Sequence, residues 1–255
     1  MITRLIVFIL FVVQMGLAQE VVYVKGGVYR PFMNIDQGRD QKKTFQVVDF
    51  YIDKYPVTID DFVDFLNHLQ PSPSLLDSIS CGQLPNGIIF DDQAKKYLTK
   101  EGNERIPVEA VSWYGAKIFS EWKGGRLPSG LEWEYAANGG NETIKFEFSG
   151  SDNADEVAIY KKKNAQVVGQ KKPNELGIYD MTGNVWEWTT TNKDNLIYKE
   201  YETFLKRDAY EIRGGSWREL QTLFLRIQQP AYMFPSNCRL SIGFRVIYDT
   251  LNTVK

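Results

Sequence analysis

The chain has 255 residues, of which 43% are hydrophobic and 24% are charged, and its formal net charge is -2. This composition is that of a globular protein, and it lacks the basic excess that is typical of a nucleic-acid binder. Aromatic residues make up 14% of the chain, which suits a fold whose loops are held by large rings more than by long regular elements.

The first 18 residues have the composition of a secretory signal. Arg4 supplies a positive charge, residues 5–13 form a short apolar core, and small residues end at Ala18. The apolar run is short for a membrane span, although an N-terminal anchor or a buried first element is the alternative. No cysteine follows it, so a lipid anchor is not indicated. We expect an exported protein, periplasmic, envelope-associated or secreted, with one domain over residues 19–255 and no later transmembrane span.

The first elements after this segment are predicted to be strands. Residues 21–24 and 27–29 have β-forming composition around a glycine turn, and residues 45–52 form one β-rich stretch. Thr58 with Asp61 three residues later is a helix N-cap signature, followed by apolar residues at helical spacing.

Residues 70–102 are the least regular part of the sequence. Pro71 and Pro73 indicate a loop, and residues 88–90 a short strand. Two helices are predicted beyond it. One opens at Ser112 and ends at a Gly-Gly pair, and the other opens at Ser129. The rest of the chain reads as short strands and long turns.

Four motifs, in order, resemble those of the formylglycine-generating-enzyme (sulfatase-modifying-factor) domain family. They are Phe50–Thr58; Pro107–Trp113 with Gly125–Ala137; Gly177–Trp188; and Arg213–Trp217 with Gly243–Arg245. The resemblance covers nearly all of the chain after the signal-like segment. It implies an α+β fold, related to C-type lectins, with little regular secondary structure.

The motifs also have a physical interpretation of their own. Arg126, Arg213 and Arg245 each carry a planar five-donor group that can bridge loop carbonyls and carboxylates. Trp186 and Trp188 would share one face of an extended segment, with Glu187 on the other. These residues are expected mainly to build the fold.

The resemblance implies a structural calcium site. Position by position, Asp180 and Glu187 would give side-chain oxygens, and Gly183 and Val185 backbone oxygens. The alternative is that Asp180 caps a turn and Glu187 pairs with an arginine. The family's other calcium loop would lie near residues 158–160, but Ile159 stands where a side-chain ligand is usual, so no second site is predicted.

The resemblance also implies what is missing. The family's enzymes hold copper with two cysteines that follow the Gly-Gly-Ser motif by three and eight residues, where this chain has Glu219 and Phe224. We therefore predict no catalytic residue, no copper and no sulfatase activation. The only cysteines are Cys81 and Cys238, and whether they pair is left open. A single histidine, His68, is too few for a facial triad of two histidines and a carboxylate.

We therefore expect a non-catalytic binding or scaffold protein of the cell envelope, similar in its motifs to the gliding-motility and type IX secretion lipoproteins. Its ligand groove would be near Trp186, Ser216, Glu219 and Phe224, and its partner an envelope protein, a peptide or a glycan. Two alternatives stay open: an enzyme of the same superfamily with altered, copper-free chemistry around Glu219, and a purely structural part of an assembly.

Overall fold

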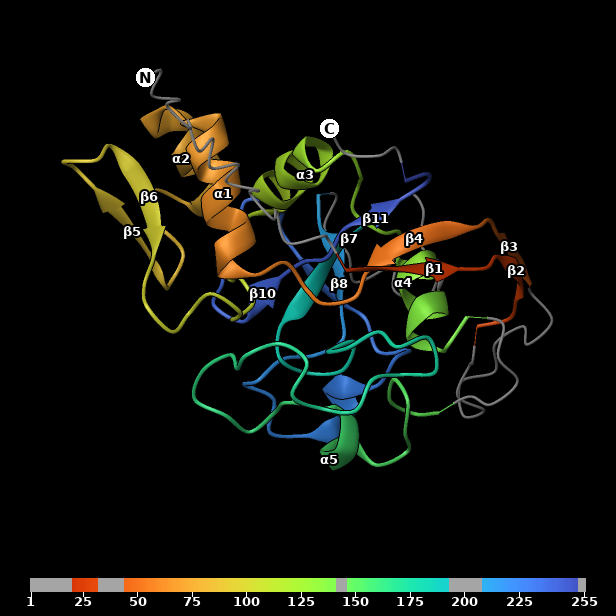
Figure 1. Ribbon diagram of the computed structural model, residues 1–255. Coiled ribbons are helices and arrows are strands. Elements are labelled where there is room, and N and C mark those ends of the chain that lie inside the picture. The colour runs from red at the N-terminus through yellow and green to blue at the C-terminus, as the bar shows by residue number, and fades with distance from the viewer. Residues whose placement is uncertain (1–19, 32–43, 141–145, 193–207, 252–255) are drawn as a thin grey trace, which may run out of the picture.

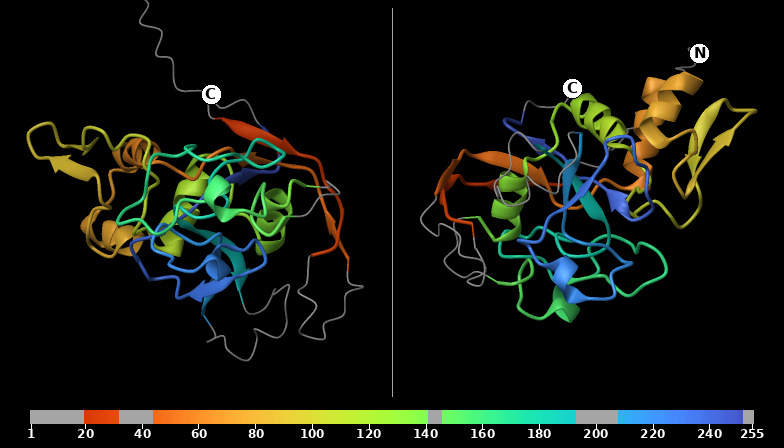
Figure 2. Two further views of the ribbon diagram at one scale, coloured as in Figure 1. Left: turned by 90° about the horizontal axis from the view of Figure 1, so that it is seen from below. Right: turned by 180° about the vertical axis from the view of Figure 1, so that it is seen from behind.

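The computed structural model describes residues 20–31, 44–140, 146–192 and 208–251 (Figure 1). The signal-like residues 1–18 lie outside these ranges. Helices α1 (Ile59–Leu69) and α2 (Pro73–Ser80) lie at one end of the molecule with the hairpin of β5 (Ile88–Asp91) and β6 (Lys96–Thr99). The strands from β1 (Val21–Val24) to β4 (Phe50–Asp53) lie at the other end (Figure 2). No helix in the described ranges combines the length and the apolar character needed to cross a membrane.

A three-stranded sheet has the order β1–β4–β11, with β4 in the middle. Its strands are β1 (Val21–Val24), β4 (Phe50–Asp53) and β11 (Ile247–Tyr248), so the two ends of the domain pair with the same strand. Strand β2 (Gly27–Tyr29) pairs separately with β3 (Phe45–Val47). The first two strands match the predicted ranges.

The stretch predicted as one β segment over residues 45–52 is two strands, β3 and β4, with different partners. The break falls at Val48 and Asp49, where Asp49 Oδ1 accepts a hydrogen bond from the backbone of Gly26 at 2.9 Å. A Cβ atom at Gly26 would lie 2.4 Å from the carbonyl oxygen of Val47. Only glycine permits this close approach, so the two strands bend around it.

Helix α1 (Ile59–Leu69) begins at Thr58 with a complete capping box. It is followed by α2 (Pro73–Ser80), which corrects the prediction of a loop there. Ser72 caps α2 and Pro73 occupies its first turn, a position that tolerates proline because the missing N–H would be unpaired anyway. The hairpin of β5 (Ile88–Asp91) and β6 (Lys96–Thr99) comes next, and β6 was not predicted.

Helix α3 (Trp113–Trp122) and helix α4 (Gly130–Ala137) begin after Ser112 and Ser129, as predicted. Aromatic rings fill the core between α1 and α3, where Phe62 stacks on Phe119 with ring centroids 5.7 Å apart. Trp133 of α4 is fully buried in a second core cluster beneath the β1–β4 sheet.

The second sheet has the order β10–β7–β8–β9. It consists of β7 (Trp186–Asn192), β8 (Tyr210–Arg213), β9 (Ala231–Met233) and β10 (Ile242–Gly243). Only the β10–β7 pair is parallel. The short helices α5 (Ala154–Val157) and η4 (Thr222–Leu225) lie below it in Figure 1. The expected α+β fold with little regular secondary structure is confirmed.

Candidate functional site: a cleft over the second sheet

The two faces of strand β7 have opposite chemistry, as its alternation predicts. Trp186 and Trp188 belong to the apolar cluster around α3, and Trp188 lies opposite Ile212 of β8. Glu187 points to the other face, where its Oε2 accepts a hydrogen bond from Trp133 Nε1 of α4 at 2.6 Å. The sheet thus separates an apolar face from a buried ionic layer.

An open cleft of about 370 Å³ lies over the apolar face. All four strands of the sheet contribute to its lining, together with η4, residues 218–219 and residues 239–241. Its lining residues are Trp186, Ile212, Arg218, Glu219, Phe224, Ala231, Met233, Arg239, Leu240, Ser241 and Ile242.

Three of the four residues predicted for the groove line this cleft, namely Trp186, Glu219 and Phe224. The fourth, Ser216, is fully buried and contacts the cleft through Glu219. Glu219 Oε1 accepts hydrogen bonds from Trp186 Nε1 at 3.0 Å and from Ser216 Oγ at 3.2 Å. Phe224 keeps 41% of its surface exposed. The four residues are therefore brought together, with a fixed carboxylate beside an open apolar surface.

Three further lining residues, Arg218, Arg239 and Leu240, were not predicted from the sequence. Arg218 stands next to the predicted Glu219 and follows directly from the same motif. Arg239 and Leu240 come from a segment about twenty residues further along, with no pattern that ties it to the groove. Their neighbour Ser241 fixes that segment, because its backbone N–H donates to Glu109 Oε2 at 2.8 Å and its carbonyl accepts from the Trp186 N–H at 2.8 Å.

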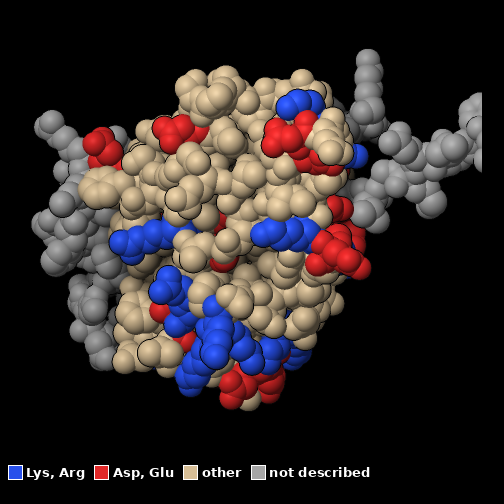
Figure 3. Space-filling view, turned by 90° about the vertical axis from the view of Figure 1, so that its left-hand side faces the viewer, with Lys and Arg blue, Asp and Glu red and all other residues tan. Residues whose placement is uncertain are grey.

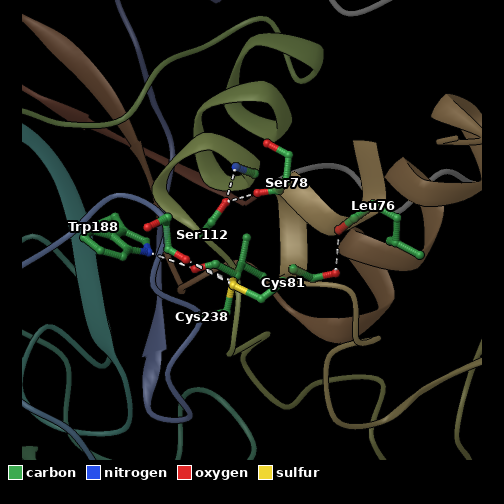
Figure 4. Close-up of a disulfide and its surroundings, with 10 residues drawn as sticks. Leu76, Ser78, Cys81, Ser112, Trp188 and Cys238 are labelled. Atoms are coloured by element: carbon green, nitrogen blue, oxygen red, sulfur yellow. Dashed lines mark hydrogen bonds between the residues drawn. A yellow bond between two sulfur atoms is a disulfide. The ribbon is translucent and has the colours of Figure 1, made fainter. Parts of the chain in front are cut away.

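Cys81 and Cys238 are joined in a disulfide bond (Figure 4). Cys81 follows the last turn of α2, and Cys238 directly precedes Arg239 and Leu240. The disulfide thus ties one wall of the cleft to α2, beside the N-terminus of α3 where Ser112 lies (Figure 4). Neither cysteine belongs to the cleft lining.

The loop predicted to hold calcium is buried and already hydrogen-bonded. Glu187 Oε1 and Oε2 accept from Arg245 Nη2 and Nε at 2.7 Å each, and all these side-chain atoms are excluded from solvent. Asp180 Oδ2 accepts the N–H of Gly169 at 2.7 Å. Burial raises the pKa of Asp180 to about 6.

As arranged here, these side chains do not fit a calcium ion, because Glu187 would have to leave Arg245 to become a ligand. No group of three or more His, Cys, Asp or Glu side chains within the described ranges is placed to hold a metal. Calcium binding by Asp180, Gly183, Val185 and Glu187 therefore stays a prediction from the sequence.

Glycine is needed at position 183 for a structural reason that does not involve a metal. Its φ is +78°, and a Cβ atom there would lie 2.4 Å from the carbonyl oxygen of Ile159. Ile159 is buried and forms a bridge with Gly183. The segment where the family's second calcium loop would lie is therefore joined to the first loop by backbone contacts, and Ile159 is buried there in place of a side-chain ligand.

Together the fold and the cleft define an α+β domain with an open, apolar-floored site over its second sheet. The chain belongs to the family of the sulfatase-modifying factor enzyme 1-like domain, whose model matches residues 12–250.

Three relatives illustrate the family. The chain is 29% identical to the serine/threonine-protein kinase Pkn1 of Chlamydia trachomatis over 91% of its own length, but it spans 39% of that kinase. It is 30% identical to the chaperone protein LppX of Paenibacillus barcinonensis, with 67% of this chain and 71% of LppX covered. It is 24% identical to the inactive C-alpha-formylglycine-generating enzyme 2 of Bos taurus, with 79% and 77% covered.

Among solved structures, CarF superposes with a TM-score of 0.67 at 20% identity, covering 90% of this chain and 97% of CarF. This likeness shows that the fold is shared along the whole domain. It confirms the formylglycine-generating-enzyme fold that the four motifs predicted.

Proposed function

We propose that this chain is a non-catalytic binding protein of the cell envelope or its exterior, and that its cleft takes an apolar group of a peptide or glycan. The observation that carries this proposal is the cleft itself. Phe224 and Leu240 leave 41% and 43% of their surfaces exposed beside it. Apolar surface gathered in a concave site is typical of a binding site.

The residues at the positions of the family's cysteines support a binding role. Glu219 is held by two hydrogen bonds, and Phe224 offers only a ring. Both thiols of the chain are used in the disulfide, outside the cleft lining. A thiol that could attack a substrate sulfur is thus not present at the cleft.

The relatives agree with this reading at a coarser level. One carries the name of a chaperone and another that of an inactive enzyme. We carry over from them the absence of the oxidase chemistry and the binding of a partner.

Export is proposed from the N-terminal composition. The test is the N-terminal mass of the protein from its native host, which should correspond to cleavage after Ala18.

The binding role is tested by screening the purified chain from residue 19 onward against peptide and glycan arrays. The variant Phe224→Ala/Leu240→Ala removes the exposed apolar surface of the cleft and should lose the signals. The control Ile89→Ala/Phe90→Ala removes side chains of matched exposure, 41% each, from the β5–β6 hairpin, and should keep them.

The same preparation tests the alternative of an enzyme. Copper and iron content is measured by mass spectrometry, and oxidation of a cysteine-containing peptide is followed under air. A binding protein gives neither a stoichiometric redox metal nor turnover. Stoichiometric copper or iron with turnover that depends on Glu219 would overturn the proposal in favour of altered chemistry.

A further inference from the structure

Two arginines on the cleft lining have no carboxylate partner among the residues that the structure describes. Arg218 and Arg239 are both exposed, and neither is ion-paired to a carboxylate anywhere in the described ranges. Arg218 instead rests over the ring of Trp217, with its guanidinium carbon 5.4 Å from the centroid. The single carboxylate of the lining, Glu219, is bonded to Trp186 and Ser216. The rim therefore carries more positive than negative charge.

This positive charge continues beyond the cleft. The backbone of Lys161 donates to the carbonyl of Glu219 at 3.1 Å, and that of Lys162 to the carbonyl of Trp217 at 2.8 Å. Exposed lysines therefore adjoin Arg218 at positions 161, 162 and 163. Figure 3 shows Lys and Arg side chains gathered on the lower part of one face of the molecule, with acidic groups at its lower edge. This concentration occurs in a chain whose overall net charge is -2.

The floor of the cleft is aliphatic more than aromatic. Ile212, Ala231, Met233 and Ile242 lie on it, while Trp186 is only 7% exposed and uses its indole N–H for Glu219. Sugar rings are held by stacking on open aromatic faces, whereas a floor of this kind accepts an aliphatic side chain. The floor thus favours a peptide over a glycan.

We infer that the ligand is an acidic peptide segment. An apolar side chain of the peptide lies on the floor beside Phe224 and Leu240, and its carboxylates pair with Arg218 and Arg239. Further acidic residues of the peptide extend along Lys161, Lys162 and Lys163. Guanidinium groups pair with carboxylates through two parallel hydrogen bonds, which gives both affinity and orientation. This inference rests on the proposed binding function and specifies its ligand.

The test is selection from a random twelve-residue displayed peptide library on the immobilised chain from residue 19 onward, at about 50 mM salt. The enriched peptides should carry more Asp and Glu than Lys and Arg, and at least one large apolar residue. Their affinity should fall at least about tenfold in Arg218→Glu/Arg239→Glu, and it should fall as salt rises, because exposed charge pairs are screened.

The matched control reverses two exposed charges outside the cleft, in Lys96→Glu/Lys100→Glu on the β5–β6 hairpin, and should leave the affinity unchanged. Thermal melting of both double variants confirms that they fold. Polygalacturonate, an acidic glycan without apolar side chains, is the second probe and should bind more weakly than the selected peptides.

Three results would overturn the inference. Enriched peptides without an acidic bias, but sensitive to Phe224→Ala/Leu240→Ala, would refute the charge selection and leave the binding function standing. Cleft-dependent binding of polygalacturonate with no enriched peptide would refute the peptide class alone. If neither a peptide nor polygalacturonate bound in a way that depends on the cleft, the inference and the proposed function would be refuted together.

Discussion

Arg245 and Glu187 form a bidentate ion pair from which water is fully excluded. The remaining donors of Arg245 reach the carbonyl oxygens of Asp53 at 3.0 Å and Tyr179 at 2.9 Å. One side chain thus joins β4, β7 and the loop before β7. A buried charge needs this degree of pairing, because the protein interior does not replace the water that it loses.

Glu187→Ala should lower the free energy of unfolding by about 3–5 kcal/mol, since it leaves Arg245 charged and unpaired in the interior. Urea unfolding measures this loss. The matched variant Thr190→Ala, on the same strand but half-buried and uncharged, should cost about 1 kcal/mol or less.

The same variant tests the calcium prediction. If Glu187 is a calcium ligand, the loss caused by Glu187→Ala disappears in EDTA. If its partner is Arg245, the loss is equal with calcium and with EDTA, and this is the result we expect. A fall in the melting temperature of the unaltered chain in EDTA, restored by added calcium, would show that calcium binds through the other predicted ligands.

Asp180→Asn should stabilise the chain at neutral pH. The pKa of Asp180 is raised to about 6 by burial, so the folded state holds this proton more tightly than the unfolded state does. Ionisation of the carboxyl group therefore lowers the free energy of unfolding. This loss grows as the pH rises from about 4 to about 6, and it is complete above pH 6. Asparagine keeps an acceptor for the Gly169 N–H and tolerates the positive φ of +57°.

The gain expected in Asp180→Asn at pH 7 is at most about 3 kcal/mol, the free energy of a two-unit pKa shift. It should shrink toward zero as the pH falls to 4, in unfolding experiments with EDTA present. A gain that is the same at pH 4 and pH 7 would mean that ionisation of Asp180 is not its cause.

Reduction of the disulfide should destabilise the chain by about 2–5 kcal/mol, because the bond closes a loop of 157 residues in the unfolded state. Melting with and without a reducing agent measures this effect. Cys81→Ser/Cys238→Ser should melt at the temperature of the reduced protein and should not respond to the reductant. A response in that variant would point to an effect of the reductant elsewhere.

Glu219→Ala should leave the fold intact, with a loss of about 1 kcal/mol or less. The side chain is half-buried at the edge of an open cleft, so water can replace the acceptor that Trp186 and Ser216 lose. Unfolding should stay cooperative. Aggregation of this variant would show that Glu219 supports the core.

Local signals in the sequence predicted the starts of α1, α3 and α4, because a capping residue and its partner lie within one turn. They also contained α2, in Ser72 with Pro73 at the first turn, but two prolines close together equally indicate a loop. The split between β3 and β4 could not be predicted in this way. It depends on Gly26, which contacts Val47 only after the chain has folded back.

The distinction between local signals and long-range contacts also applies to the candidate site. Trp186 and Ser216 lie in family motifs, and Glu219 and Phe224 stand at the family's two cysteine positions, so the four could be placed together in advance. Arg239 and Leu240 reach the cleft through a disulfide and through the hydrogen bonds of Ser241, which are long-range contacts without a local pattern. The partner of Glu187 was foreseen only as one of two alternatives, because spacing does not decide between an arginine and a metal ion.

The separation of the two faces of β7 and β8 bears on how this domain can diversify. The ion pairs of Glu187 and Arg213 lie on the side of α4, whereas the rim groups Arg218 and Arg239 are exposed, and Arg218 only rests over the ring of Trp217. Substitutions at the rim can therefore alter what is recognised at almost no structural cost. A protein that inherits this scaffold can acquire new partners through changes at a few exposed residues while the buried core stays constant.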